Sequence, residues 1–404
     1  MKNRELIYQA VVDSLIKFRP YFEQKEMIGQ KGHIDKKYED MMDLLESAYS
    51  FSPNREEFLN GITRMLTIEQ AEIFPAFPLF SFDPEDHPAQ PLSWVAERVR
   101  PELEKKLDVL TKDMVEKHFI LFMGERNGEK VYMRNYLFGL VRIYAFLPDT
   151  PLTEPSLHWF YNAAKEKGVS EAMKPEPIPY ETLPHEGILT GDHKFGKIPM
   201  NMVIPDEREI IPYDLASEVI KKSRRMAVKP CLCRLAMEKK NKKQCGHPVE
   251  GYCMGFDEAA DAVIASGLGK EKTKEEMLEI LKECRDRGLV QQVSNANRPL
   301  VICNCCKDCC ILLNSLARGE RSLSKPSRFV AKIEKECRKC QVCIENCPMD
   351  ALVMTVTGAL VLTDKCIGCG LCAAKCPFGV ISLKRKDGEI KKERDRKVVD
   401  RVYI

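Results

Sequence analysis

The sequence predicts a multidomain α+β protein. Three observations support this. Apolar residues recur at helical spacing through the first half, short alternating segments typical of strands occur in the second half, and 18 cysteines gather in two stretches of the 404-residue chain. A chain of this length is long enough for two or three domains. We expect a largely helical domain at 1–150, a linker at 151–212, a cysteine-rich α+β module at 213–325, a small cysteine-repeat domain at 328–386 and a charged tail at 387–404.

The amino-terminal part carries helical patterns followed by a hairpin signal. A helix is expected over 101–117, with Pro101 in its first turn and one apolar face formed by Leu103, Leu107, Leu110 and Met114. A loosely alternating segment then leads from His118 into Asn127-Gly128, and 131–133 returns. Helix, helix and hairpin in this order predict a winged-helix-like domain.

Winged helices often bind DNA, so a redox-sensing regulator is one alternative function. The helix expected over 101–117 and its flanks carry as many acids as bases, namely Arg100, Lys105, Lys106, Lys112 and Lys117 against Glu102, Glu104, Asp108, Asp113 and Glu116. A helix that reads DNA needs a basic face for phosphates. The balanced charges favour a protein–protein surface, and DNA is not a favoured partner.

One cysteine signature occurs twice near the carboxyl-terminal end, with every cysteine and the proline repeated at an offset of 29. The copies are Cys337-x2-Cys340-x2-Cys343-x3-Cys347-Pro348 and Cys366-x2-Cys369-x2-Cys372-x3-Cys376-Pro377. This resembles the bacterial two-cluster ferredoxin, which holds two [4Fe–4S] clusters. The alternative is a pair of zinc knuckles, but zinc sites do not require the x3-Cys-Pro ending.

The ferredoxin resemblance implies crossed ligation, in which the fourth cysteine of each repeat serves the other cluster. Cluster one then takes Cys337, Cys340, Cys343 and Cys376. Cluster two takes Cys366, Cys369, Cys372 and Cys347. Between the ligands, residues 351–361 predict a short hairpin, and Val380, Ile381 and Leu383 predict a closing strand.

A second group of cysteines occupies the middle of the chain. Nine are candidate metal ligands, namely Cys231, Cys233, Cys245, Cys253, Cys303, Cys305, Cys306, Cys309 and Cys310. Three interpretations remain open: one or two further iron–sulfur clusters, a zinc site at the Cys306-x2-Cys309 spacing, or a dithiol/disulfide redox site. His247 is a candidate tenth ligand. Cys284 shares a face with Met277 and Leu281 on a helix capped by Thr273, and is expected in the core.

A run rich in lysine and arginine, from Lys221 to Lys243, precedes and overlaps this cysteine group. Cations stabilise the negative charge of a thiolate-bound cluster, and Arg234 is the favoured donor to cluster sulfur. The run is equally consistent with a solvated basic face, and docking of an acidic partner is a third use.

The order Cys-x-Cys-Arg, Cys-Gly-His-Pro, Cys-x-Cys-Cys-x2-Cys-Cys and then the double repeat resembles a group of multidomain ferredoxin-like proteins from anaerobes. The resemblance implies a cytoplasmic electron-transfer protein that serves a redox partner or a larger oxidoreductase complex. A reductase with an open iron site in the cysteine-rich module is the further alternative. No catalytic residue, nucleotide-binding motif, secretory signal or membrane span is indicated, and the net charge is only +3.

Overall fold

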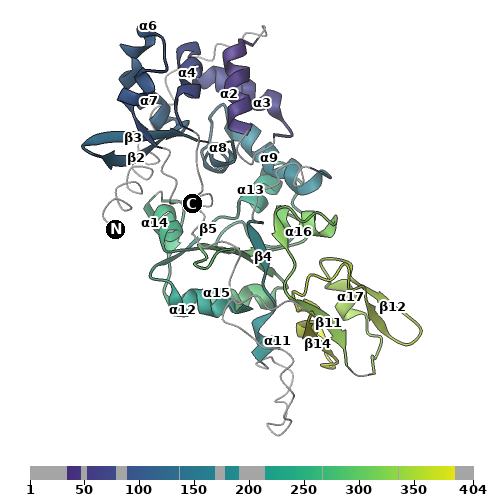
Figure 1. Ribbon diagram of the computed structural model, residues 1–404. Coiled ribbons are helices and arrows are strands. Elements are labelled where there is room, and N and C mark those ends of the chain that lie inside the picture. Colours follow the sequence, from purple (N-terminus) through teal and green to yellow (C-terminus); the bar gives the residue numbers. More distant parts are fainter. Residues whose placement is uncertain are drawn as a thin grey trace.

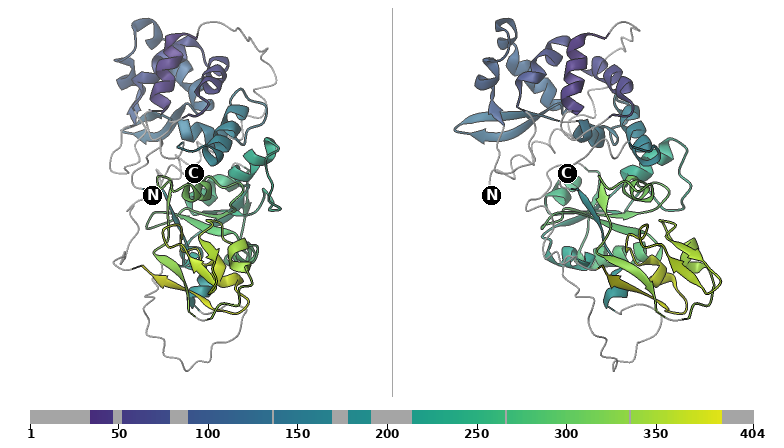
Figure 2. Two further views of the ribbon diagram at one scale, coloured as in Figure 1. Left: turned by 90° about the vertical axis from the view of Figure 1, so that its right-hand side faces the viewer. Right: turned by 45° about the vertical axis from the view of Figure 1, so that its right-hand side comes forward.

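The computed structural model describes residues 34–46, 52–78, 89–135, 137–168, 178–190, 214–265, 267–334 and 336–386. The charged tail expected at 387–404 lies outside the described residues. In three views, the amino-terminal helices lie at one end and strands β11 to β14 at the other, with a large sheet between them (Figures 1 and 2). Within the described residues, no helix has the length and apolar character needed to cross a membrane.

The amino-terminal unit consists of helices around a three-stranded sheet. Its elements are α2 (Lys36–Glu46), α3 (Arg55–Met65), α4 (Ile68–Ile73), the 3-10 helix η2 (Phe74–Ala76), β1 (Gln90–Pro91), α5 (Leu92–Ala96), α6 (Pro101–Glu104), α7 (Leu107–Glu116), β2 (Ile120–Arg126), β3 (Glu129–Arg134), α8 (Leu137–Tyr144) and α9 (Thr153–Lys165). The sheet order is β1-β3-β2, and both pairs are antiparallel.

Two local features of this unit follow from its sequence. The β2–β3 hairpin turns at Asn127 and Gly128, whose positive φ angles of 53° and 81° suit a tight two-residue turn. The helix expected over 101–117 is instead two helices, α6 and α7, separated at Lys105 and Lys106.

The middle of the chain forms a seven-stranded sheet in the order β10-β4-β8-β9-β6-β5-β7. All neighbours are antiparallel except the parallel pair β10 and β4. Its elements are β4 (Tyr180–Thr182), α11 (Glu186–Thr190), α12 (Ala216–Lys222), β5 (Met226–Lys229), α13 (Leu232–Lys239), β6 (Cys253–Phe256), α14 (Glu258–Ala265), β7 (Lys270–Glu271), α15 (Lys274–Asp286), β8 (Val290–Ser294), β9 (Val301–Cys305), α16 (Ile311–Ala317) and β10 (Ser324–Lys325).

The expectation of an irregular linker over 151–212 is wrong for the described part of that range. Residues 153–165 form α9, which packs against α13 and α16, and β4 lies inside the seven-stranded sheet. Trp159 and Ala163 of α9 are completely buried. The prolines around this segment therefore mark turns between packed elements, and not an independent connection between domains.

The two faces of the seven-stranded sheet have different chemistry because side chains alternate along a strand. One face is apolar: Met254 and Ile302 pack with α12 and α15 in one hydrophobic cluster. Cys284 of α15 is buried, as expected, and Thr273 and Glu276 form the predicted capping box. The opposite face carries the cysteines of β6 and β9.

The carboxyl-terminal domain is small and closed by paired strands. Its elements are β11 (Phe329–Ile333), α17 (Val342–Glu345), β12 (Leu352–Met354), β13 (Ala359–Val361), α18 (Leu371–Lys375) and β14 (Ile381–Arg385). The predicted hairpin is confirmed by the antiparallel pairing of β12 with β13. The predicted closing strand is also confirmed, because β14 pairs with β11 along its whole length.

Candidate metal centres

The first quartet of the repeat domain surrounds a small cavity. The cavity is lined by Cys337, Cys340, Cys343 and Cys376, together with apolar residues that include Phe378 and Ile381. Cys376 comes from the second repeat, so three cysteines of one repeat and one of the other meet here. Cys340 is exposed, and the Phe378 side chain is 52% exposed. This quartet therefore lies at the surface of the domain.

The second quartet also draws on both repeats. Burial and then the neighbouring thiols Cys369, Cys366 and Cys347 raise the pKa of Cys372, and Cys343 of the first quartet acts in the same direction. Burial is the largest influence on Cys369 and raises its pKa to about 12, and the neighbouring thiols act in the same direction. A buried thiol with this pKa becomes a thiolate at neutral pH when a metal supplies the compensating positive charge.

The two repeats share one backbone conformation at equivalent positions. Lys339 and Gly368 have φ angles of 55° and 67°, and Gln341 and Gly370 have φ angles of 65° and 79°. In each repeat, the residues directly before and directly after the second cysteine are left-handed, and they bend the loop around its cysteines. The second repeat requires glycine at 368, because a Cβ there would lie 2.1 Å from the Phe329 carbonyl oxygen.

Backbone N–H groups point at the ligand sulfurs. Lys339 and Ala359 each donate to Cys337 Sγ at 3.4 Å, and Ala351 donates to Cys347 Sγ at 3.3 Å. The bond from Ala359 is the largest influence that lowers the pKa of Cys337. Such bonds stabilise thiolates and tune the potential of a bound cluster. Thiol chemistry, loop shape and these donors all fit iron–sulfur ligation.

The second quartet faces the middle module. Cys347, Cys366 and Cys369 pack against the large hydrophobic core that also contains Cys305 and Cys310. The backbone N–H of His185 donates to the Cys369 carbonyl oxygen at 2.9 Å, and Lys307 forms an ion pair with Asp350 at 2.7 Å. The repeat domain thus contacts the middle module at its second quartet. Cys343 and Cys376 of the first quartet also share a buried cluster with Ile188 and Leu189 of α11.

The middle module brings all nine candidate cysteines near β6, β9 and the first turns of α13 and α16, but it divides them into two groups. Six thiols form a continuous series in which each influences the pKa of the next, in the order Cys231, Cys233, Cys310, Cys305, Cys303 and Cys253. We call these residues the six-thiol group. They include a cross-strand pair, since Cys253 lies directly opposite Cys303 in the sheet.

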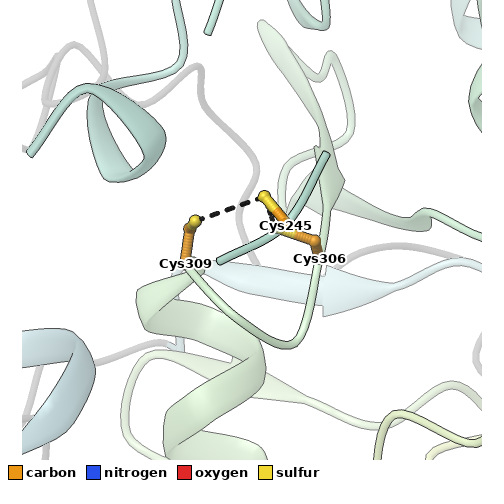
Figure 3. Close-up of side chains that lie close together, drawn as sticks. All are labelled: Cys245, Cys306 and Cys309. Carbon is orange, nitrogen blue, oxygen red and sulfur yellow. Dashed lines mark hydrogen bonds between the residues drawn. The ribbon is translucent and has the colours of Figure 1, made fainter. Parts of the chain in front are cut away.

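The other three cysteines form a separate three-thiol group, shown in Figure 3: Cys245, Cys306 and Cys309. The Cys245 Sγ lies 3.6 Å from Cys309 Sγ and 3.8 Å from Cys306 Sγ. His247 is not part of this group, although its ring Nδ1 is buried without a hydrogen-bond partner. The structure therefore does not place His247, the tenth candidate ligand suggested by the sequence, among these three thiols.

Two buried cations accompany these groups. Lys229 is opposite Cys253 in the β5–β6 pair, and burial lowers its pKa more than the neighbouring thiols raise it. Arg234 is 1% exposed and donates to the Asn304 carbonyl oxygen at 2.7 Å. A hydrogen bond with Cys309 and, to a smaller extent, Arg234 lower the pKa of Cys306 to about 5. The sequence pointed to Arg234 but did not distinguish Lys229 from its basic neighbours.

Most of the basic run around these residues is neutralised at the surface. Arg224 and Arg225 pair with Asp261, and Arg225 also pairs with Glu271. Lys240 pairs with Glu154, and Lys221, Lys222 and Lys243 have acidic partners as well. The run does not present a continuous positive surface for an acidic partner.

Comparison with known proteins gives one family match and several similar proteins. Residues 359–382 match the 4Fe-4S binding domain family. Two proteins of Methanocaldococcus jannaschii, both described as uncharacterized ferredoxins, are 34% and 33% identical over 86 and 87 residues, or 21% of this chain. A tetrathionate reductase subunit of Archaeoglobus fulgidus is 40% identical over 53 residues, which is 12% of this chain and 26% of that protein.

The chain spans about half the length of the two ferredoxins that it matches, 54% and 51%. No solved structure matches it significantly. The family match covers the second cysteine repeat, and that repeat is related to the first by the constant offset and by the shared left-handed positions. The carboxyl-terminal end of this chain is therefore a ferredoxin-type 4Fe-4S binding domain.

Proposed function

We propose that this protein transfers single low-potential electrons through two [4Fe–4S] clusters, as a subunit or adaptor for a redox partner. Cluster one is held by the surface quartet Cys337, Cys340, Cys343 and Cys376. Cluster two is held by the second quartet Cys366, Cys369, Cys372 and Cys347. No catalytic residue is needed for this role, since a bound cluster supplies the one-electron chemistry.

The observation that carries the proposal is the unequal placement of the two quartets. The first opens to solvent at Cys340, where a partner protein can approach. The second packs against the core that contains the middle cysteines. The proposed electron path therefore runs between a partner at the surface quartet and the interior of the middle module.

The six-thiol group supports an additional iron–sulfur cluster in the middle module. More than four thiols converge, three of them from the neighbouring strands β6 and β9, and Lys229 lies beside Cys253 and Cys303. Soft thiolates in this number favour iron–sulfur chemistry, and a buried cation offsets the negative charge of a bound cluster. This cluster extends the relay beyond cluster two.

Iron and acid-labile sulfide measured on anaerobically purified full-length protein test this function. With two ferredoxin clusters and one cluster at the six-thiol group, about twelve irons and about twelve sulfides per chain are expected, with reduction giving signals of several interacting clusters by electron paramagnetic resonance. A result of about eight irons per chain would contradict the additional cluster. Absence of iron together with disulfide formation contradicts electron transfer itself.

A larger complex is the proposed setting of this relay. The Archaeoglobus fulgidus protein that this chain resembles over 53 residues is named as one subunit of a tetrathionate reductase. By this likeness, the present chain passes electrons to or from a separate catalytic subunit. The exposed Phe378, next to the Cys376 ligand of the surface quartet, offers an apolar contact for such a partner.

We further propose that the amino-terminal unit is winged-helix-like and serves as a protein interface. Its helix–strand–helix–strand–strand order and its β1-β3-β2 sheet support this assignment. The bases around α7 have acidic neighbours: Lys117 pairs with Asp113, Lys106 with Glu69, and Arg100 with Glu72. Cations engaged in this way contribute little to phosphate binding.

We therefore expect no strong DNA binding in either redox state. Fluorescence anisotropy with mixed-sequence duplexes at about 50 mM salt measures this, because non-specific phosphate contacts are strongest at low salt. The same protein with its clusters oxidised is the matched comparison. Tight binding that weakens steeply with salt and changes on oxidation would instead support the redox-sensing regulator.

A further inference from the structure

The three-thiol group has the dimensions of a site for one metal ion. Its Sγ–Sγ distances of 3.6 Å and 3.8 Å join Cys245 to Cys309 and to Cys306, and all three sulfurs lie within 4.8 Å of one another. Zinc–sulfur bonds of about 2.3 Å at the tetrahedral angle place two sulfur ligands about 3.8 Å apart. The observed spacing matches three corners of such a tetrahedron.

The cysteines of the ferredoxin-type domain provide an internal comparison. In a [4Fe–4S] cluster each thiolate binds a different iron, so the four sulfurs are spread further apart. Among the residues that the structure describes, the three-thiol group is the one set of three or more candidate ligands whose donor atoms are all this close. Neither ferredoxin quartet forms such a set, and neither does the six-thiol group.

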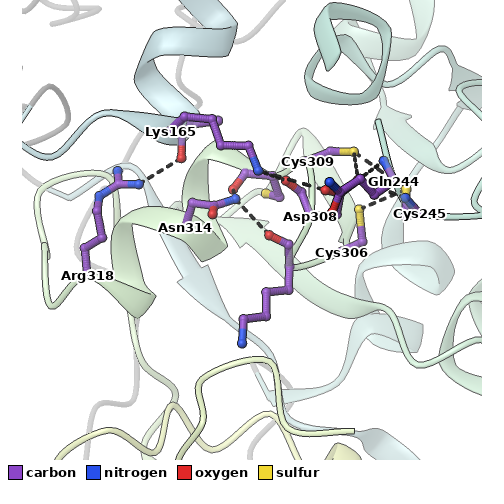
Figure 4. A network of polar contacts seen from close by, with 11 residues as sticks. Lys165, Gln244, Cys245, Cys306, Asp308, Cys309, Asn314 and Arg318 are labelled. Atoms are coloured by element: carbon purple, nitrogen blue, oxygen red, sulfur yellow. Dashed lines mark hydrogen bonds and ion pairs between the residues drawn. The ribbon is translucent and has the colours of Figure 1, made fainter. Parts of the chain in front are cut away.

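The fold holds these thiols together through Asp308, as Figure 4 shows. One carboxylate oxygen, Asp308 Oδ2, accepts the backbone N–H groups of Gln244 and Cys245 at 2.8 Å and 2.9 Å. In its thiol form, Cys309 Sγ donates to the same oxygen at 3.1 Å, and binding of an ion releases that proton. The loop that carries Cys245 is thereby fastened to the loop that carries Cys306 and Cys309.

Neighbouring elements hold the second loop from its other side. Lys165 at the end of α9 donates to the Asp308 carbonyl oxygen at 2.6 Å. Asn314 of α16 donates to the carbonyl oxygens of Lys307 and Cys310, both at 2.9 Å. The site is thus built where α9 meets the middle module.

The surrounding charge suits a divalent ion. Three thiolates, the nearby Asp308 carboxylate and one zinc-class ion carry a net charge of −2. The guanidinium of Arg234 and the ammonium of Lys165, whose Nζ lies 3.9 Å from Asp308 Oδ1, supply two compensating positive charges. Arg234 is 1% exposed, and its positive charge lowers the pKa of Cys306. Two of its guanidinium nitrogens donate to the carbonyl oxygens of Asn304 and Pro248, at 2.7 Å and 3.4 Å, which holds the guanidinium in place, while its Nε has no hydrogen-bond partner.

We propose that Cys245, Cys306 and Cys309 bind a single zinc-class divalent ion at a centre separate from the iron–sulfur clusters, with a nitrogen or oxygen donor in the fourth position. Adjacent cysteines then belong to different centres. Cys305 and Cys310 face the six-thiol group, while Cys306 and Cys309 face the ion.

Adjacent cysteines also give matched variants for the test. In anaerobically purified full-length protein, we expect one zinc per chain, and Cys306→Ser and Cys309→Ser are expected to lose it while keeping their iron. Cys305→Ser and Cys310→Ser are expected to keep zinc and to lose about four irons. The electron paramagnetic resonance signal of the ferredoxin-type domain, retained in all four variants, confirms that each remains folded.

Zinc-edge X-ray absorption on the unmodified protein is the second measurement, with three sulfurs at about 2.3 Å and one lighter atom expected. Absence of zinc, four sulfurs around it, or loss of iron from Cys306→Ser overturns the single-ion site. About sixteen irons without zinc would overturn it and leave the electron carrier standing. Zinc without any iron would support the single-ion site and contradict the electron carrier.

Discussion

Replacing Cys347 with alanine is expected to remove cluster two and leave cluster one, with a loss of about four irons per chain. Cys347 belongs to the first repeat in sequence, but in space it lies with the second. Its thiol is affected by Cys366, and it acts in turn on Cys369 and Cys372. Loss of one thiolate leaves an iron without its protein ligand in a buried site.

The measurement combines iron analysis with electron paramagnetic resonance of the reduced protein. The spectrum of interacting clusters should be replaced by a simpler one. Electron transfer from the surface quartet to the middle module should stop. Cys284→Ala is the matched control, because Cys284 is equally a cysteine, is completely buried, and has no quartet thiol among the groups that influence its pKa. If Cys347→Ala destroys the surface cluster instead, the ligation is not crossed.

The Gly368→Ala substitution is expected to have the second large effect, a loss of unfolding free energy. The new Cβ would lie 2.1 Å from the Phe329 carbonyl oxygen and 2.3 Å from Ser327 Oγ, and the residue would keep a φ of +67°. Phe329 belongs to β11, so the obstacle is paired backbone that does not move freely. Left-handed strain and overpacking together are expected to cost about 2–5 kcal/mol of unfolding free energy.

Chemical unfolding of the anaerobic holoprotein, followed by cluster absorbance, measures this change. Lys339→Ala is the control, because Lys339 occupies the equivalent position of the first repeat with a φ of 55°. That position already accepts a side chain, so alanine is expected to change the unfolding free energy by less than about 0.5 kcal/mol. Equal effects at 339 and 368 would show that close packing is not the reason for glycine.

These two experiments concern the part of the protein that short-range spacing predicts well. Tandem cysteines at constant offsets predict two similar loops, and the loops indeed share left-handed residues at equivalent places. What spacing does not reveal is why one loop carries Lys339 and Gln341 where the other carries Gly368 and Gly370. That difference arises because the second loop lies against Phe329 and His185, which are distant in sequence.

The linker prediction failed for a related reason. The residues of α9 follow a proline-rich stretch, and β4 has only three residues, so neither gives a strong periodic signal. Both are stabilised by contacts with remote segments: α9 with α13 and α16, and β4 with β8 and β10. Elements this short depend on tertiary packing more than on their own propensity.

The basic run shows the same limitation. Its composition did not decide between a cluster environment, a solvated face and a docking surface. Asp261 and Glu271, far along the chain, neutralise Arg224 and Arg225 at the surface. Lys229 and Arg234, in contrast, are buried near thiols because β5 pairs with β6 and α13 begins at the cysteine loop.

Sequence alone determined the chemistry of this protein, because thiol spacing and the repeated signature are local properties of the chain. The division of the middle cysteines into a six-thiol and a three-thiol group came only from the tertiary structure. Cys305 ends a strand whose face is set by pairing with β6 and β8, whereas Cys306 turns toward a loop held by Asp308. Neighbours in sequence therefore belong to different thiol groups, since the direction of a side chain depends on what its backbone pairs with.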